Sequence, residues 1–425
     1  MTAVGKWRNE GKLGKAYIIP KDKDLQRWRP IAPACDDPAR LGQRRCARAL
    51  HCLITRYDKR LNFHLASTIQ LKEEALRADT EFGEQGCSLA IGRCYDIKEM
   101  FSSIPHDAVR SAVFELIRDF ENKNWCQVKV AVRGRLIVLS KTDRKEVGYV
   151  KVGMNTIFKM VNYDLSHAYM RCGETIRRQI VGIPMGKTMS PILATVTCAM
   201  DETKFLKSLG ADKRLVKGWR MVDDVSIVVG CNKEGGAWTR AHDNLDAFEA
   251  AYDPRLKLVR KDDGSNTWQF VGGRMYIMAD PVQVHFVQDI KNADCIRQDG
   301  MLRYQSLQDF VSYSEKKMKK AVMTANLKRI WNSSTSPALT ASTIAYALLE
   351  SDLRGYPSEV SLGALAKLAK VTGESILVNL RLYWLSCHKI LRRLDPWNFL
   401  RNSYGLTSWD TEQRLGIFTG CNFSK

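Results

Sequence analysis

Two adjacent acids, Asp223 and Asp224, interrupt an apolar stretch near the middle of the chain. Residues 219–230 around them read Trp-Arg-Met-Val-Asp-Asp-Val-Ser-Ile-Val-Val-Gly. The β-branched residues predict two strands, with the acids at the tight turn between them. Burying two neighbouring negative charges costs free energy, which oxygen coordination of a divalent cation usually offsets. A solvated hairpin tip would also explain the pair, because Asp is a common turn residue.

The size and charge of the chain narrow its class. Its 425 residues are enough for two or three domains, and the net charge of +20 indicates a polyanionic partner, most simply nucleic acid. A basic mitochondrial or ribosome-associated protein would carry a similar charge. The apolar runs are too short to span a bilayer, so we expect no membrane partner. Because the N-terminus lacks a secretion signal, we expect a soluble, intracellular protein, in a compartment that the sequence does not identify.

Cysteine usage argues against structural zinc. The 12 cysteines are scattered, without a CxxC pair or a matching set of Cys and His. Free thiols in a reducing compartment are the simplest explanation.

A third acid stands alone at the end of another apolar run. Within residues 89–105, apolar residues bracket Asp96, and Phe101 follows five positions later. An isolated Asp at the end of a buried strand needs a compensating partner. The apolar spacing from Val109 to Phe120 then predicts an amphipathic helix.

A glycine-bearing loop precedes the predicted helix that begins at Ser190-Pro191. Its residues 181–189 read Val-Gly-Ile-Pro-Met-Gly-Lys-Thr-Met. The glycines Gly182 and Gly186 would let the backbone approach a ligand closely, and Pro at the first helical position favours a helix start.

Basic clusters occur on both sides of these segments. Residues 16–31 predict two strands around a charged turn, which could bind a triphosphate, although this segment alone favours a solvated hairpin. Residues 38–77 read as helical, with arginines that could contact a nucleic-acid backbone or simply face solvent. Residues 127–139 predict a hairpin around Arg133-Gly134-Arg135, and helices dominate after residue 290. One of those helices would present four lysines on its surface: Lys316, Lys317, Lys319 and Lys320.

In this order, five segments resemble the motifs of the reverse transcriptase family. The similarity spans roughly residues 15–280, and the nearest groups would be stand-alone enzymes of group II introns, retrons or telomerase-like relatives. The loop departs from the family at Met185, Lys187 and Thr188, and Met221 stands where an aromatic residue is common. The five segments are Arg27–Ile31 (fingers), Asp96–Pro105 (catalytic strand), Gly182–Gly186 with Ser190-Pro191 (loop), Met221–Asp224 (paired aspartates) and Phe270–Gly272 (primer grip).

The resemblance implies an α+β right-hand polymerase with fingers, an antiparallel-sheet palm and a helical thumb. Residues 1–95 would form the N-terminal region and fingers. Residues 89–289 would form the palm, with a further part of the fingers inserted at about 122–180. Residues 290–425 would form the helical thumb or a C-terminal extension.

The resemblance also implies RNA-directed DNA polymerase chemistry, in which a primer 3′-hydroxyl is extended with dNTPs. Two Mg²⁺ ions, which Mn²⁺ could replace, would be bridged by Asp96 and Asp223, with Asp224 as a weaker or outer ligand and the Ile97 carbonyl completing one shell. Lys261 would help to protonate the leaving pyrophosphate, and Lys257 is the competing candidate.

Further roles follow for the substrates. Lys21 or Lys23, with Arg29, would neutralise the triphosphate. Phe101 would lie beneath the ribose and exclude a 2′-hydroxyl. Partners would be an RNA template, a DNA or RNA primer, dNTPs and possible ribonucleoprotein components. The remaining residues comprise the loop contacts (Gly182, Met185, Gly186), the primer grip (Phe270, Val271, Gly272) and the duplex-binding thumb lysines (Lys316, Lys317, Lys319, Lys320).

Two other functions share these features. A viral-type RNA-dependent RNA polymerase has the same palm, but its loop motif normally carries an Asn that residues 188–192 lack. A catalytically silent scaffold in a ribonucleoprotein has no physical need to keep three mutually repelling carboxylates. The sequence therefore favours an active reverse transcriptase.

Overall fold

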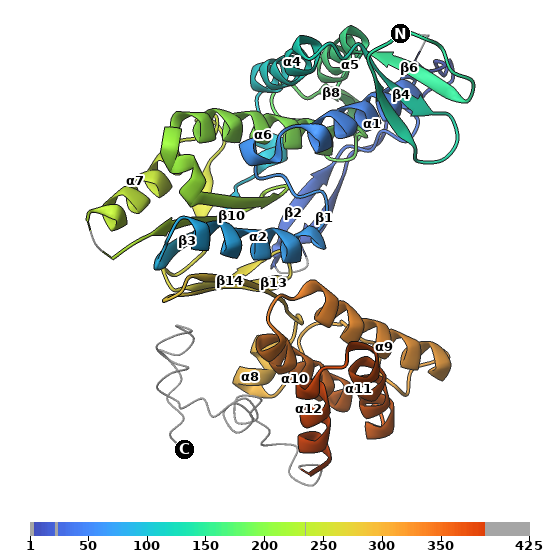
Figure 1. The fold of residues 1–425 in the computed structure, drawn as a ribbon. Coiled ribbons are helices and arrows are strands. Elements are labelled where there is room, and N and C mark those ends of the chain that lie inside the picture. The colour runs from blue at the N-terminus through green and yellow to red at the C-terminus, as the bar shows by residue number, and fades with distance from the viewer. Residues whose placement is uncertain (1–3, 22–23, 234, 387–425) are drawn as a thin grey trace.

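The computed structural model describes residues 4–21, 24–233 and 235–386 (Figure 1). Lys23, a predicted triphosphate ligand, lies outside the described residues, as does the end of the predicted C-terminal region.

The chain begins with a hairpin and two helices. Strands β1 (Tyr17–Lys21) and β2 (Asp24–Ile31) pair antiparallel, which confirms the two predicted strands. The single helical region predicted over 38–77 is instead α1 (Arg40–Arg56), the 3-10 turn η1 (Lys59–Leu61) and α2 (Gln70–Glu84). The break has a local cause, because the Asp58 side chain accepts a hydrogen bond from the Arg60 amide and caps the short turn.

A four-stranded antiparallel sheet, which we call the central sheet, organises the fold. Its order is β11 (Leu258–Arg260), β3 (Leu89–Ile97), β10 (Asp224–Cys231) and β9 (Val216–Met221). Val225, Ile227 and Val229 pack on one face with the core of α6 (Ser190–Ser208) and α7 (Ala237–Glu249). Val228 packs on the other face. Burial on both faces explains why the sequence of β10 is almost continuously apolar.

A second sheet covers that other face. It consists of β12 (Thr267–Phe270), β13 (Gly273–Met278) and β14 (Gln283–Gln288). The indole of Trp268 lies directly over Gly92 of β3, where an added Cβ would meet the ring at 2.0 Å. The same indole donates a hydrogen bond of 3.0 Å to the Ser226 hydroxyl of β10. Gly92 is therefore what allows the two sheets to pack closely.

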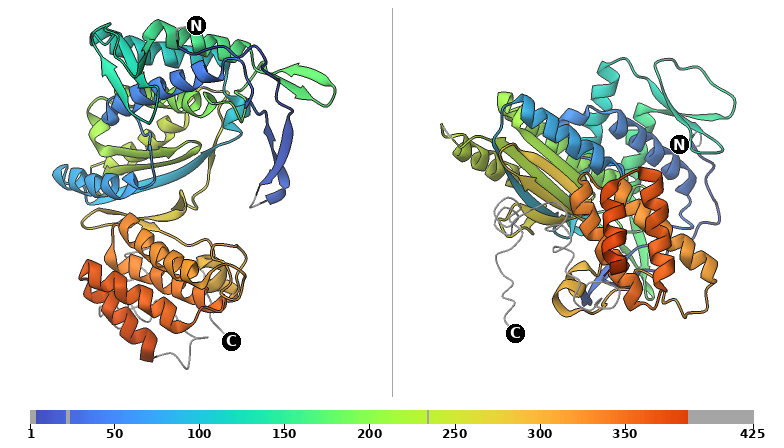
Figure 2. Two further views of the ribbon diagram at one scale, coloured as in Figure 1. Left: turned by 90° about the vertical axis from the view of Figure 1, so that its right-hand side faces the viewer. Right: turned by 60° about the horizontal axis from the view of Figure 1, so that its bottom comes forward.

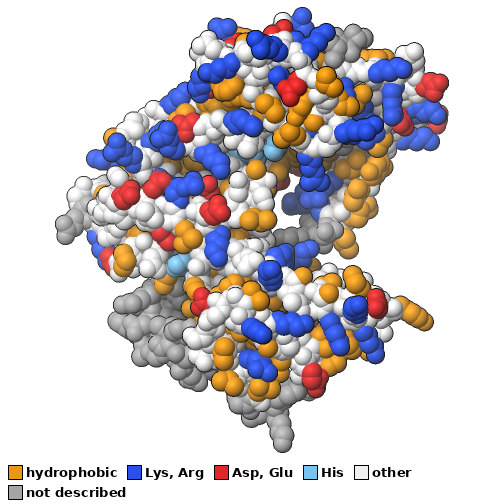
Figure 3. Space-filling view, turned by 45° about the vertical axis from the view of Figure 1, so that its right-hand side comes forward, with side chains coloured by type: hydrophobic (Ala, Val, Ile, Leu, Met, Phe, Trp, Pro, Cys, Tyr) orange, Lys and Arg blue, Asp and Glu red, His pale blue; other side chains and the backbone are white. Residues whose placement is uncertain are grey.

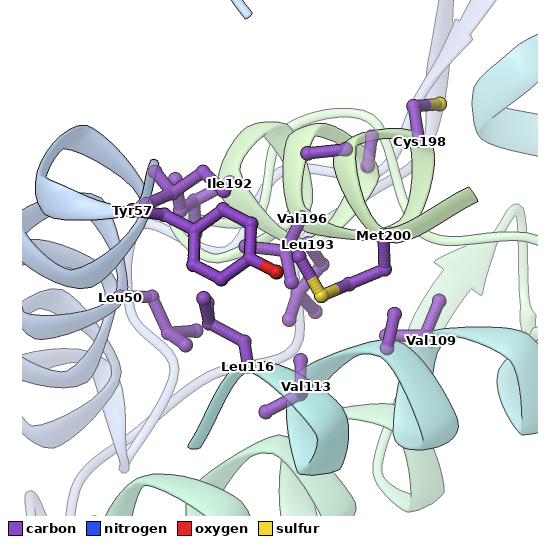
Figure 4. Close-up of a cluster of buried hydrophobic side chains, with 14 of the residues drawn as sticks. Leu50, Tyr57, Val109, Val113, Leu116, Ile192, Leu193, Val196, Cys198 and Met200 are labelled. Atoms are coloured by element: carbon purple, nitrogen blue, oxygen red, sulfur yellow. The ribbon is translucent and has the colours of Figure 1, made fainter. Parts of the chain in front are cut away.

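Between β3 and β9, the chain forms most of a lobe with α1 at the top of Figure 1. Leu50 of α1, Leu116 and Leu193 point toward one another in its core (Figure 4). A three-stranded sheet of order β5-β4-β6 contacts α1. The elements are α3 (Met100–Ser103), α4 (His106–Asn122), β4 (Gln127–Ala131), β5 (Ile137–Ser140), β6 (Tyr149–Gly153), α5 (Met154–Ser166), β7 (Tyr169–Cys172), β8 (Thr175–Arg178) and α6.

The described chain after β14 is helical and has its own apolar core, built around Met323, Leu327, Ile344 and Leu365. These helices lie below the two sheets in Figure 1 and in the left view of Figure 2. Within residues 4–386, apart from the short gaps, we find no helix with the length and apolar character needed to cross a bilayer. The helices are α8 (Ala293–Asp299), α9 (Lys316–Ser333), α10 (Pro337–Leu353), α11 (Ser358–Thr372) and α12 (Ser375–Ser386).

Candidate active site

The three acids meet where β3 and β10 run side by side. Asp224 is the first residue of β10 and lies directly opposite Asp96 of β3. Asp224 also pairs with Met221 of β9, so that Val222 and Asp223 form a two-residue turn, with Val222 at a φ of 60°. The predicted strand pair is confirmed, and only one of its two acids occupies the turn. The backbone of the turn is tied to β3, because the Ile97 amide donates to the Asp223 carbonyl at 2.9 Å.

Lys261 places a positive charge between two of these acids. Its ammonium lies 2.9 Å from Asp96 Oδ1 and 2.9 Å from Asp224 Oδ1. The two carboxylate oxygens therefore cannot be farther apart than twice that distance. The Lys261 backbone is fixed as well, since its amide donates to the Cys94 carbonyl of β3 at 2.8 Å.

The pKa values of Lys261 and Asp223 are both raised, which favours the charged form of Lys261 and the neutral form of Asp223. Burial lowers the pKa of Lys261, but hydrogen bonds to Asp96 and Asp224 more than offset it, so that the net pKa is raised. Burial raises the pKa of Asp223 above its usual range, and the charges of Asp224 and Asp96 add to the rise. Lys261 is thus held as a cation, whereas Asp223 lacks an equivalent compensating charge.

The donor set can be tested for its fit to a divalent cation. Asp96 and Asp224 fit, because their oxygens already share one cation, the Lys261 ammonium. Asp223 does not complete the set, since among the described residues no three Asp, Glu, His or Cys side chains converge on a metal position. The assignment of all three acids and of the Ile97 carbonyl to metal binding remains a prediction.

Glycines in the loop serve close packing within the protein. Gly182 has a φ of 76°, and an added Cβ would lie 2.5 Å from the Ser102 carbonyl. Gly186 has a φ of 118°, and its added Cβ would lie 2.8 Å from the Ala32 carbonyl. These glycines therefore allow a close approach to the chain's own backbone, and their predicted contact with a ligand stays a prediction.

The same loop joins the first hairpin to the turn after β3. The Ala32 amide donates to the Met185 carbonyl at 2.7 Å, and the Ile183 amide donates to the Phe101 carbonyl at 2.7 Å. Phe101 is half-buried on α3 and packs against the main core. Lys21 is half-buried and Arg29 is exposed on the hairpin. The loop thus links the elements that carry the predicted nucleotide contacts.

The predicted primer-grip residues form a tight turn of the second sheet. Phe270 ends β12 and is buried, whereas Val271 and Gly272 turn the chain with φ values of 47° and 76°. The Gly272 carbonyl accepts a hydrogen bond from the Gln288 side chain, which holds the turn against β14.

The four thumb lysines divide into two groups. Lys316, Lys317 and Lys320 are exposed on α9. The prediction was wrong for Lys319, which is 2% exposed and donates to the Phe310 carbonyl at 2.9 Å and to the Ser312 carbonyl. Lys319 shares the buried face of α9 with Met323, and backbone carbonyls compensate its charge.

Sequence reasoning missed an ion pair beneath the paired acids. Arg220 of β9 and Glu202 of α6 have side chains that are 0% exposed, and they contact each other directly. Glu202 also accepts from the Tyr252 hydroxyl at 2.8 Å and from the Phe63 amide at 2.9 Å. Arg220 donates to the Val222 carbonyl at 3.3 Å and so supports the turn that carries Asp223. The available signal was a charged residue three positions before Asp223 in an apolar strand.

A second buried pair fixes the loop. The Lys187 ammonium lies 3.0 Å from Asp164 Oδ1 of α5 and also donates to the Asp164 and His167 carbonyls. Gln43 of α1 donates to the same carboxylate oxygen at 2.8 Å. Lys187, noted only as a departure in the sequence, therefore tethers the loop to α5, whose Asp164 is in turn bound by α1.

Comparisons with known proteins support the fold. Apo telomerase from Candida tropicalis aligns with a TM-score of 0.51 at 14% identity, over 94% of this chain and 69% of that chain. Telomerase from Candida albicans in complex with a fragment of telomeric RNA aligns with a TM-score of 0.54 at 13% identity, over 90% of this chain and 64% of that chain. The chain thus spans about two thirds of the length of these proteins. No protein-family model and no curated protein sequence matches it.

At these identities the likeness concerns the fold alone. The fold is similar to that of telomerase, a polymerase related to reverse transcriptases, and that part of the resemblance is confirmed. An RNA-dependent RNA polymerase aligns with a TM-score of only 0.40, which is too low to bear on the fold.

Proposed function

We propose that this protein is an RNA-directed DNA polymerase that extends a primer 3′-hydroxyl with dNTPs. The observation that carries the proposal is the pairing of Asp96 with Asp224 on adjacent strands, where both carboxylates share one cation. Asp223 lies in the adjoining turn, and its carboxyl feels the charges of both of these acids. The similarity of the fold to telomerase supports the same reading.

In this proposal each part of the chain takes a role in a right-hand polymerase. The central sheet with the second sheet is the palm, and the helices after β14 are the thumb. The first hairpin and the lobe around α1 are the fingers. An RNA template and a DNA or RNA primer would lie between them.

The three acids would hold two Mg²⁺ ions, and Mn²⁺ could replace them. When bound, such ions lower the pKa of the attacking hydroxyl and neutralise charge on the leaving oxygens. Lys261 would leave the carboxylates and give its proton to the leaving pyrophosphate, with Lys257 as the competing donor. The contacts of Lys261 to Asp96 and Asp224 support this role, because they keep its ammonium protonated beside the reacting groups.

Substrate selection would fall to the residues around the loop. Lys21 and Arg29 would neutralise the triphosphate. Phe101 would lie beneath the sugar and exclude a 2′-hydroxyl, and its backbone contact with Ile183 supports a fixed position for this residue. The Val271–Gly272 turn would hold the primer, and Lys316, Lys317 and Lys320 would contact the backbone of the duplex.

A primer-extension assay on an RNA template tests the proposal. With Mg²⁺, we expect incorporation of dNTPs by the parent protein and none by Asp96→Asn or Asp223→Asn, although both variants should fold. Incorporation of NTPs in preference to dNTPs would instead identify an RNA polymerase. Tight template binding by the folded parent protein without any incorporation, in Mg²⁺ or Mn²⁺, would identify a silent scaffold.

A further inference from the structure

The three-stranded sheet β5-β4-β6 plays no part in the site described above. It contacts α1 through all three strands. Arg48 of α1 holds the turn between β4 and β5, because it donates to the carbonyls of Ala131, Gly134 and Leu136 at 3.2–3.3 Å. This turn is therefore a fixed part of the upper lobe, even though its own side chains are exposed.

The charge of this sheet is strongly unbalanced. Residues 127–153 contain seven Lys and Arg residues but only two acids. Both acids already have partners, since Asp143 pairs with Lys151 at 2.6 Å and Glu146 pairs with Lys129 at 3.0 Å. The other five cations are exposed and have no carboxylate partner among the described residues: Arg133, Arg135, Lys141, Arg144 and Lys145.

The neighbouring helix adds to the positive charge. Arg44 of α1 is also exposed and has no carboxylate partner in the described chain. Next to it, burial lowers the pKa of Arg45, and the charges of Arg44 and Arg48 lower it further. Many Lys and Arg side chains lie on the upper lobe in Figure 3. Mutually repelling cations at a surface lose part of that repulsion when an anion binds.

We propose that this surface binds the phosphodiester backbone of a nucleic-acid segment at a place separate from the catalytic carboxylates. We call it the basic sheet surface and define it as Arg44, Arg133, Arg135, Lys141, Arg144 and Lys145. Four of these residues are arginines, whose planar guanidinium groups can bind phosphate in a bidentate manner. Seated on the upper lobe, the surface lies apart from β3 and β10 in the views of Figures 1 and 2.

The consequence is a second anchor for the nucleic acid. A segment outside the copied region would bind here, which raises its effective concentration at the active site without any new contact there. The inference goes beyond the proposed function and does not depend on it, because a catalytically silent protein would bind in the same way. RNA and DNA share the phosphate chemistry, so the experiment must distinguish them.

The test compares two fourfold variants with the same change in charge. The first is Arg133→Gln, Arg135→Gln, Arg144→Gln and Lys145→Gln. The control replaces four exposed cations that lie on other elements and also lack a carboxylate partner in the described chain: Lys207→Gln, Arg214→Gln, Lys291→Gln and Lys370→Gln. Circular dichroism checks that both variants fold. Binding of an RNA hairpin and of a DNA hairpin of matching sequence is then measured over a range of salt concentrations.

We expect the basic-sheet variant to lose at least tenfold in affinity, and the control less than threefold. Each phosphate contact accounts for a salt slope of about 0.9 in duplex DNA, so the variant's slope should fall by about two or more. A larger loss of affinity for one of the two hairpins shows whether the surface prefers an RNA or a DNA backbone. Equal losses in both variants, or binding of phosphatidylserine vesicles but of neither hairpin, would overturn the inference. Extension of a short primer and template should remain unchanged, which separates this outcome from failure of the proposed function.

Discussion

Two ion clusters lie at the β9–β10 hairpin, and they differ in how completely their charges are satisfied. Arg220 and Glu202 are both 0% exposed, and hydrogen bonds from Tyr252 and Phe63 use the remaining capacity of the carboxylate. In the other cluster the side chains of Lys261, Asp96 and Asp224 are 44%, 32% and 37% exposed. There Lys261 contacts only the Oδ1 atom of each carboxylate.

This difference indicates that the buried pair has a structural role, whereas the exposed cluster can exchange its cation. A buried pair that loses one partner leaves an uncompensated charge in a low dielectric, so it must stay intact for the protein to fold. An exposed pair contributes little to stability, because water and salt screen it. The exposed cluster can therefore exchange the Lys261 ammonium for another cation, while the buried pair of Arg220 and Glu202 keeps the β9–β10 hairpin in place.

The largest effect should come from breaking the buried cluster. Glu202→Gln leaves Arg220 without a counter-charge and should lower the free energy of unfolding by roughly 3–5 kcal/mol. Lys261→Gln, which breaks the exposed cluster, should change it by less than about 1 kcal/mol. Urea denaturation of both variants measures the two values. Similar losses in the two would show that the clusters do not differ in the way described.

A buried histidine offers a pH test of the same cluster. Neither ring nitrogen of His64 has a partner in the described structure. Burial, together with the nearby charge of Arg220, lowers the pKa of His64 to about 3. The folded state thus keeps His64 neutral, whereas the unfolded state takes up a proton below pH 6.5, so stability falls as the pH falls from 6.5 toward 3.

Linkage gives the size of this effect. Between pH 7 and pH 5, His64 should remove about 2 kcal/mol from the free energy of unfolding. Denaturation of His64→Gln should show a correspondingly flatter pH dependence, while the exposed His51→Gln should follow the parent protein. If His64→Gln keeps the full pH dependence of the parent, His64 is not the group that titrates.

The smallest expected effect is a change in divalent-metal affinity when the exposed cluster loses the Lys261 ammonium. Removing the Lys261 ammonium in Lys261→Gln frees Asp96 and Asp224 to bind a divalent ion, so the affinity for Mn²⁺ should rise about tenfold, or roughly 1.4 kcal/mol. The free Mn²⁺ signal in electron paramagnetic resonance measures this without any polymerase assay. Lys257→Gln is the matched control, and equal affinities in both variants would show that Lys261 does not compete with metal.

Much of the site was predictable, because it depends on local patterns. Period-two strands around a two-residue turn placed Asp223 and Asp224 together, and the chain order brought Asp96 to the neighbouring strand. The buried face of α9 could also have been predicted from the sequence. Lys319 lies four residues before Met323 and eight before Leu327, so the three share one side of the helix. That signal was overlooked because four lysines in five positions suggested a uniform basic surface.

The remaining features depend on tertiary partners. Nothing near Arg220 in the sequence indicates that Glu202 lies beside it, since the two approach only when α6 packs on the central sheet. The same holds for Lys187, whose partner Asp164 belongs to another helix. The loop glycines were correctly recognised as positions of close approach, but the approaching group is the chain's own carbonyl oxygen, which no local pattern specifies.

The absence of a side chain at Gly92 affects how far the proposed primer turn lies from the carboxylates of the proposed polymerase. Trp268 fills that position and is fastened to Ser226, which belongs to the strand that begins at Asp224. Three residues after Trp268, the chain enters the turn proposed to hold the primer. The position of the turn relative to the strand of Asp224 therefore depends on how closely the edge of the indole approaches Gly92. Gly92→Ala would therefore shift the proposed primer turn relative to the carboxylates, although Gly92 is not among the residues proposed to contact the substrate.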